Sequence, residues 1–341
     1  AERLSNKPLK TDYRPFDHNN GLAPYLREHL RPRLEKWCQN HTKPNGEPYN
    51  LYTDGLRVYT TIDADLQRYA EAAVDKHLPW LQGQLDKEKT TGRDSTIKNL
   101  TRKILSRMPQ YRGASLDDPN SVIHQERDME IFAWDSTRSV RMSPVDSIKY
   151  YLSMLHAGFV AMDPNNGNIL AWLGGIDHRF FKYDHVTSKR QVGSTFKPIV
   201  YANALKSGIK PCDYYPNDSI VYEEFDNWSP ANADKQYGGV YSVQGALVNS
   251  VNTVSVQMIM EGGIDSTITL AGRMGIEGRY PRVPSLALGT MNTSALNMAE
   301  AYTTFASKGR PRDGRVLYSI EDQNGRVIET FADDTLQQER V

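Results

Sequence analysis

Apolar and polar positions follow helical spacing in two N-terminal stretches of the chain. Residues 24–39 contain one helical piece with Leu, Trp and Cys at intervals of three and four. The stretch 55–85 begins with a short β-rich run, continues with Asp63 as a helix cap, and then becomes a long amphipathic helix. Residues 86–128 are polar and charged, with further helical stretches.

Three segments alternate and turn in the manner of β-hairpins. Residues 129–144 predict a hairpin that turns at Asp135–Arg138. Residues 157–175 are two apolar runs joined by the turn sequence DPNNG, and residues 315–331 predict a last hairpin around Asn324-Gly325. Strands before and after a block of helices indicate an α/β or α+β domain with an antiparallel sheet, and no internal repeat is visible.

The segment 190–208, "RQVGSTFKPIVYANALKSG", predicts a helix whose start can be located. Proline is tolerated only in the first turn of a helix, so Pro198 requires the helix to begin close to Ser194. Gly208 ends it. Ser194 and Lys197 then share one helix face. The apolar positions expected to face a core are Phe196, Ile199, Val200 and Leu205.

These patterns divide the chain into three regions. Residues 1–56 read as a connecting segment, 57–150 as a region with helices and a hairpin, and 151–341 as the main domain. The first ten residues lack the apolar core of a signal peptide, and no run is long enough for a membrane span. The last eleven residues, "FADDTLQQERV", predict the start of a helix with nothing that ends it. We therefore expect the chain to be a fragment that is cut at both ends.

Composition and charge exclude some classes of function. The 341 residues include 41 basic and 41 acidic ones, so the formal net charge is zero. The chain therefore lacks the basic excess that would indicate a nucleic-acid partner. Cys38 and Cys212 match no metal spacing; two unpaired residues is the favoured interpretation, and pairing stays open. Asp17-His18 and His41 have no metal-like partners. We therefore predict neither a metal nor a cofactor.

The pattern Ser-x-x-Lys occurs three times, and context distinguishes the copies. Ser95–Lys98 lies in a charged segment, and Ser207–Lys210 lies at a helix end. Only Ser194–Lys197 opens an apolar helix, where a lysine can be buried and its pKa lowered. A neutral lysine can take the proton of a serine hydroxyl, and a helix N-terminus favours negative charge on its oxygen. Taken alone, such a short motif is more often a capping serine beside a surface lysine.

A second short motif changes these odds. Ser250-Val251-Asn252 is the only Ser-x-Asn in the chain and lies between two amphipathic helical stretches. By itself it reads as a helix-capping serine and a turn asparagine. Together with Ser194 and Lys197, however, the Ser250 hydroxyl can relay a proton. The Asn252 amide can hold both the lysine and a substrate carbonyl, since it donates and accepts.

Ser-x-x-Lys followed by Ser-x-Asn resembles the penicillin-recognising serine enzymes, which comprise penicillin-binding proteins and serine β-lactamases. "RQVGSTFKPIVYANAL", "AGFVAMDPNNGNILAWLGG", "ALVNSVNTVSV" and "LALGTMNTSALNMAEAYTTFASKG" look like the transpeptidase domain of a class A, bifunctional penicillin-binding protein. "YTTIDADLQRYAEAAV" resembles the segment before that domain. The resemblance runs from about residue 52 to the end and implies an α+β fold, an antiparallel sheet flanked by helices.

The resemblance implies a peptidoglycan DD-transpeptidase that β-lactams inhibit. Ser194 is then the nucleophile, Lys197 the base, Ser250 the proton relay and Asn252 a substrate-holding residue. The implied partners are stem peptides, lipid-linked precursor strands, β-lactam antibiotics and other cell-wall synthesis proteins. The implied location is the periplasmic or extracytoplasmic face of the bacterial membrane, with the anchor outside this chain. A serine β-lactamase and a non-catalytic muropeptide-binding module are the alternatives.

The family's third motif, Lys-Thr-Gly or Lys-Ser-Gly on a strand beside the site, has only one match here. Lys206-Ser207-Gly208 ends the nucleophile's own helix and is therefore a decoy. The resemblance implies that the true motif lies beyond residue 341, that the fold is truncated at its C-terminal strands, and that a glycosyltransferase domain precedes this chain.

Four further residues are candidates for the edge or the lining of the site. His185 and Lys189 precede the nucleophile and read as a surface loop at the edge of the site. Trp228 and Tyr237 are candidates for lining a peptide groove or for packing in the core or a loop.

Overall fold

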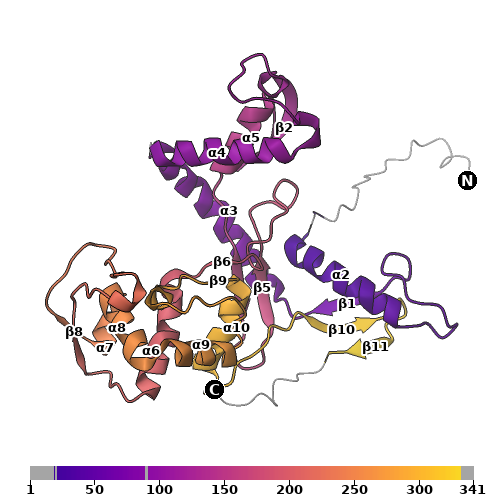
Figure 1. The fold of residues 1–341 in the computed structure, drawn as a ribbon. Helices are drawn as coiled ribbons and strands as arrows, with labels where there is room; N and C mark the ends of the chain where they lie inside the picture. The colour runs from indigo at the N-terminus through magenta and orange to yellow at the C-terminus, as the bar shows by residue number, and fades with distance from the viewer. Residues whose placement is uncertain (1–18, 20, 89–90, 332–341) are drawn as a thin grey trace, which may run out of the picture.

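A computed structural model of the chain describes residues 19, 21–88 and 91–331. Figure 1 shows a broad body and a smaller lobe that stands apart from it, joined by the long helix α3, Ala64–Lys87. The Asp63 side chain accepts hydrogen bonds from the backbone N–H groups of Asp65 and Leu66, so the predicted helix cap is confirmed.

The smaller lobe contains two helices, two short 3₁₀ turns and one hairpin around a small core of its own. The predicted hairpin is confirmed, but its turn is tighter than expected: strand pairing resumes at Ser136, so only Trp134 and Asp135 connect the strands. The elements are α4 (Thr91–Arg107), η1 (Pro109–Tyr111), η2 (Val122–His124), β2 (Arg127–Ala133), β3 (Ser136–Met142) and α5 (Pro144–Ser153).

One end of the body brings together the first and last described parts of the chain. Helix α2, Pro24–Asn40, packs on a three-stranded antiparallel sheet in the order β1-β10-β11. In this sheet Val58 of β1 pairs with Ile320 of β10. The predicted connecting segment therefore contributes a buried helix to a hydrophobic core, although the three-region division itself stays a prediction. The strands are β1 (Arg57–Thr60), β10 (Leu317–Glu321) and β11 (Val327–Thr330).

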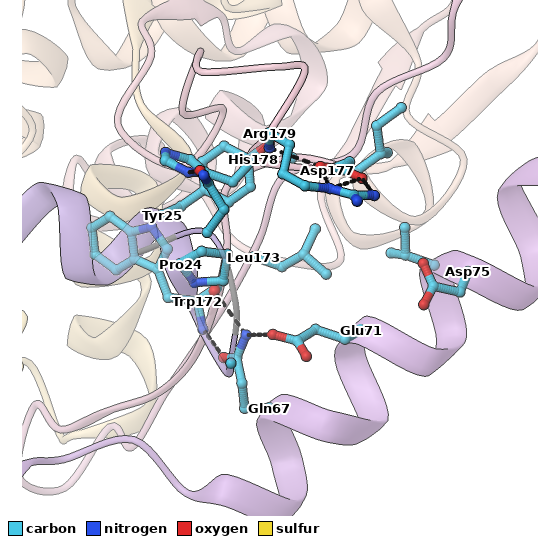
Figure 2. Close-up of a pocket in the computed structure, with 15 residues that line it drawn as sticks. Pro24, Tyr25, Gln67, Glu71, Asp75, Trp172, Leu173, Asp177, His178 and Arg179 are labelled. Carbon is cyan, nitrogen blue, oxygen red and sulfur yellow. Dashed lines mark hydrogen bonds and ion pairs between the residues drawn. The ribbon is translucent and has the colours of Figure 1, made fainter. Parts of the chain in front are cut away.

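A second hairpin, β4 (Phe159–Met162) and β5 (Ile169–Leu173), lies along α3. Gln67 of α3 is fully buried; its side chain accepts from the Trp172 backbone N–H at 2.7 Å and donates to the Trp172 carbonyl at 3.0 Å. Figure 2 shows this contact beside Glu71, at the edge of a cavity of about 400 Å³. Glu71 accepts from Gln67 and from the Ala23 backbone, so the polar groups of this region tie α2, α3 and β5 together.

The rest of the body is a cluster of helices connected by loops and short strand pairs, and it holds the largest apolar core. Its helical elements are η3 (Gly193–Phe196), α6 (Lys197–Lys206), η4 (Glu223–Phe225), α7 (Val243–Val248), α8 (Asn252–Gly262), α9 (Ile264–Arg273), η5 (Pro284–Leu288) and α10 (Ala295–Ala306). Its strand pairs are β6 (Arg190–Gln191) with β9 (Asn292–Thr293), and β7 (Tyr214–Pro216) with β8 (Val240–Ser242).

The predicted α+β class with antiparallel strands flanked by helices is confirmed. Within the described residues the strands form one three-stranded and four two-stranded sheets, because long loops and helices separate the pairs. Of the four apolar positions expected to face a core after Ser194, three are fully buried, but Leu205 near the end of α6 is 42% exposed and its prediction is wrong. The helix start predicted for 331–341 falls outside the described residues, Phe331 excepted.

Candidate active site

Ser194 lies in the 3₁₀ turn η3, and the α-helix begins only at Lys197. The helix start predicted near Ser194 therefore exists, but as a tighter turn. Pro198 is in the first turn of α6, as its missing N–H requires. In a 3₁₀ turn, side chains three residues apart stand directly in line, so Ser194 and Lys197 project on the same side. Phe196 is fully buried and fixes the turn against the core.

The turn is braced by a close approach between two glycines. Gly193 has φ of +57° and donates its N–H to the carbonyl of Gly289 at 3.1 Å. Gly289 itself has φ of +71°, and a Cβ there would lie 1.9 Å from the Gly193 carbonyl oxygen. Only glycine satisfies both the left-handed conformation and this contact. Gly289 therefore sets the position of the residue directly before Ser194.

We expect Gly289→Ala to destabilise the protein by about 1–3 kcal/mol through overpacking, with about 1 kcal/mol more for the left-handed backbone. Urea unfolding measures this change. Gly272→Ala in α9 is the matched control, because its added Cβ meets no atom within 4 Å and its backbone suits alanine. Equal stability of Gly289→Ala and the wild type would show that the glycine contact does not brace the turn.

The Lys197 amine is held by three oxygen atoms. Its Nζ donates to Ser250 Oγ at 3.0 Å, to the Ser250 carbonyl at 2.6 Å and to Asn252 Oδ1 at 2.7 Å. The structure thus brings the Lys197, Ser250 and Asn252 side chains into contact. Lys197 is only 1% exposed.

Burial lowers the pKa of Lys197 from 10.5 to about 8. All three acceptors are neutral, so no carboxylate among them stabilises the ammonium form. An amine with this pKa is partly deprotonated at neutral pH and can accept a proton. The buried lysine predicted from the apolar helix is therefore present.

Ser250 occupies the junction between α7 and α8 in an unusual backbone conformation. Its φ is +54°, in the left-handed region that disfavours non-glycine residues. Its N–H donates to the Leu247 carbonyl, and the Val251 N–H donates to the Ala246 carbonyl, so the junction closes the end of α7. This conformation turns both the Ser250 hydroxyl and its carbonyl toward Lys197. A serine held in a conformation that favours glycine is strained, and such strain is typical of functional sites.

Ser194, Ser250 and Asn252 line one cavity of about 340 Å³. The other walls come from the loop between β7 and β8 and from the end of α7. Side-chain amides dominate this lining, and its titratable residues are Asp234 and Tyr241. The structure thus places all four sequence-predicted residues at one site: three line the cavity, and Lys197 lies behind two of them.

The remaining sequence candidates take other positions. His185 lines a neighbouring hollow with Thr195 and contacts Arg190 at 3.1 Å, and burial lowers the His185 pKa to about 4. Trp228 stacks on Tyr222 and packs against the core, while Tyr237 is exposed. Neither of these aromatics is among the residues that line the cavity.

The Lys206-Ser207-Gly208 match and the two cysteines lie in other parts of the chain. Ser207 and Lys206 end α6, far along the helix from Ser194. Cys38 and Cys212 are both free thiols, as favoured from sequence. Among the residues that the structure describes, no group of three or more His, Cys, Asp or Glu could hold a metal ion. Asp17-His18 lies outside these residues.

The structure adds residues to the site that sequence reasoning missed. Asn217 and Asn232 line the cavity and are 4% and 7% exposed. Both lie in a loop rich in Asn, Gly and Pro, where asparagine reads as an ordinary turn residue. The signal that distinguishes them is their burial, which the sequence pattern does not carry.

The family model described as penicillin binding protein transpeptidase domain matches residues 157–341, more than half of the chain. The model of the penicillin-binding protein middle domain matches residues 76–155. Among curated proteins, penicillin-binding protein 1A of Rickettsia felis is 26% identical over 82% of this chain and 39% of its own length. The chain thus spans about two fifths of the length of such relatives.

Solved structures show the same fold. The crystal structure of penicillin-binding protein 1A from Haemophilus influenzae superposes with a TM-score of 0.66 at 22% identity, covering 97% of this chain and 52% of that one. The PonA1 protein of Mycobacterium tuberculosis, solved in complex with penicillin V, gives a TM-score of 0.57 at 22% identity, covering 91% of this chain and 65% of that one.

The fold is that of the penicillin-binding proteins in these solved structures, with the residues of the transpeptidase model preceded by those of the middle-domain model. More particularly, the chain belongs to the penicillin-binding protein transpeptidase domain family. Among the helices of residues 19, 21–88 and 91–331, none has the length and apolar content needed to cross a membrane.

Proposed function

We propose that this chain is the transpeptidase part of a peptidoglycan-synthesising enzyme and that it works through an acyl-enzyme on Ser194. The observation that carries the proposal is the buried amine of Lys197, the residue that begins α6 directly after the 3₁₀ turn that holds Ser194. This amine donates to Ser250 and Asn252. Its lowered pKa supports the role of a base. Family membership supports stem peptides as substrates.

In the proposed first step, Ser194 Oγ attacks the carbonyl carbon of the D-Ala-D-Ala peptide bond while neutral Lys197 takes the hydroxyl proton. The Ser194 backbone N–H, at the start of the turn, is one donor to the developing oxyanion. The carbon–nitrogen bond then breaks. The proton passes from Lys197 through Ser250 Oγ to the leaving amine, so D-Ala departs and an ester on Ser194 remains.

In the second step, an amine from a neighbouring stem attacks the ester. Its proton returns by way of Lys197 to Ser194 Oγ, and the new amide is the cross-link. In this proposal Asn252 orients Lys197 through its Oδ1, and the second N–H of its Nδ2, beside the one bonded to the Ala231 carbonyl, donates to the substrate carbonyl. Its loss should therefore weaken acylation without abolishing it. The two steps require no cofactor or metal.

The family also supports a setting for this reaction. We infer that the complete protein carries a glycosyltransferase and an anchor and acts at the periplasmic or extracytoplasmic face of the bacterial membrane. Lipid-linked precursor strands and other cell-wall synthesis proteins would then be its partners. β-Lactams, whose strained amide mimics the peptide bond, would acylate the same serine.

Incubation with penicillin followed by intact-mass measurement tests the proposal. We expect one adduct per chain, located by peptide mapping on the segment that contains Ser194, and persisting for long periods after excess drug is removed. Rapid loss of the adduct with drug turnover would favour a β-lactamase. Absence of any adduct, both on this chain and on one extended past Val341, would favour a non-catalytic muropeptide-binding module.

A further inference from the structure

A buried asparagine from a distant loop caps the helix that carries Asn252. Asn232 Oδ1 accepts from the backbone N–H groups of Asn252 at 3.0 Å and Thr253 at 3.3 Å. The first N–H groups of a helix need an outside acceptor, and a side chain at the N-cap normally supplies it. The N-cap of α8 is Val251, which has no side-chain acceptor. Asn232, twenty positions before Asn252 in the chain, takes over this role.

The donor end of Asn232 is fixed as firmly as its acceptor end. Its Nδ2 donates to the Gln236 carbonyl at 2.8 Å and to Asn217 Oδ1 at 2.7 Å. Asn217 Oδ1 also accepts from the Thr253 hydroxyl at 2.7 Å, which returns the network to α8. A buried polar network that is fully bonded has one preferred arrangement, because every alternative leaves a group unpaired. The loop and the start of α8 are therefore locked to each other.

The same network also determines which end of the Asn252 side-chain amide faces Lys197. Asn252 Nδ2 donates to the carbonyl of Ala231, the residue next to Asn232, at 2.8 Å. With its donor group engaged there, the Asn252 Oδ1 atom points to Lys197 Nζ. The three neutral oxygen atoms that accept from Lys197 belong to Ser250 and Asn252. Their positions therefore depend on the bonds by which residues 231–232 hold the start of α8.

We infer that Asn232 is a positioning residue of the active site: it holds Ser250 and Asn252 in contact with the Lys197 amine through the capped start of α8. This inference rests on the proposed function of the same cavity. Asn232 does not touch Lys197 through any of these bonds, so it acts through α8. The charged and titratable groups that line the cavity, Asp234 and Tyr241, are not its partners in the network.

The test compares Asn232→Ala with Asn203→Ala in the same chain. Asn203 is a suitable control because it is also buried, at 5% exposure, and its Nδ2 also ties helices together, here by donating to the Gly262 carbonyl and Ser266 Oγ at the far end of α6. Both variants should lower the melting temperature. Only Asn232→Ala should slow acylation by penicillin, by about 10–100-fold, since it alone loosens the site.

The pKa of Lys197 supplies a second readout that does not require acylation. It can be followed by the pH titration of the ¹³Cε resonance of Lys197, assigned by its absence in Lys197→Arg. We expect a pKa near 8 in the wild type and in Asn203→Ala. In Asn232→Ala the pKa should rise toward 10.5, because water enters the loosened shell of oxygen atoms.

The outcomes separate the inference from the proposed function. If penicillin does not acylate the wild-type protein, the proposed function is wrong. The titration of Lys197 in Asn232→Ala still tests the role of Asn232 in that case. An unchanged Lys197 titration in Asn232→Ala would overturn the inference. If Asn232→Ala does not fold, Thr253→Val removes the outer bond to Asn217 and should shift the same titration in the same direction by a smaller amount; no shift there would also overturn it.

Discussion

The Ser194→Ala variant is expected to form no covalent adduct with penicillin, even after hours with excess drug. Alanine removes the oxygen that would carry the acyl group. The other serine that lines the cavity, Ser250, is bonded to Lys197 and lies in a junction of constrained backbone. Ser194 is exposed and lies at the start of a helical turn, so its replacement should leave the fold intact. Intact-mass spectra of the variant and the wild type, taken side by side, measure the effect.

The decoy serine provides the matched control for this experiment. Ser207 also begins a Ser-x-x-Lys pattern, but its hydroxyl donates to the Asn203 carbonyl at the end of α6. Ser207→Ala should therefore be acylated at the wild-type rate. An adduct on Ser194→Ala at the wild-type level would mean that another residue is the nucleophile.

Lys197→Met should reduce the rate of acylation by about 10²–10⁴-fold, the range typical for loss of a general base. Methionine fills a similar volume without an amine, so Ser250 and Asn252 lose a shared donor and Ser194 loses its proton acceptor. Stopped-flow measurement with a chromogenic β-lactam gives the rate constant. The control is Lys206→Met, which alters an exposed lysine on the same helix.

Two outcomes of this comparison would count against the role of Lys197. One is a Lys197→Met rate within a few-fold of the wild type. The other is an equal loss in Lys206→Met, which would point to a general effect of charge or stability on the helix. Circular dichroism of each variant establishes that the fold is retained before rates are compared.

The residues that the structure brings together at the cavity could be named from the sequence because the motifs that contain them depend on short-range spacing. Pro198 limits where the helix starts, and the apolar residues after Ser194 indicate a buried side for Lys197. Ser-x-Asn is equally local, so Ser250 and Asn252 could be named without knowing their distance from Lys197. That these motifs meet across 53 positions of sequence was implied by the family resemblance alone.

The supporting structure could not be predicted, because it arises from contacts between distant segments. Nothing in the sequence around Gly289 indicates that a Cβ at this position would overlap the carbonyl of Gly193. Asn232 looks like any turn asparagine until its burial and its bonds to α8 are seen. The pairing of Val58 with Ile320 joins the two ends of the described chain through backbone hydrogen bonds. Any two apolar strand residues could make such bonds, so the sequence does not indicate this pair. Leu205 shows the converse error, since helical spacing near a helix end does not guarantee burial.

The measurement that tests the central claim most directly is the pH dependence of wild-type acylation by penicillin. The claim is that Ser194 is activated by a Lys197 amine kept partly neutral by burial. Because the neutral amine is the reactive form, the rate should rise with pH in proportion to its fraction and level off above about 8. A rate that stays flat between about 6 and 9, or that keeps rising toward the ordinary lysine pKa of 10.5, would contradict it.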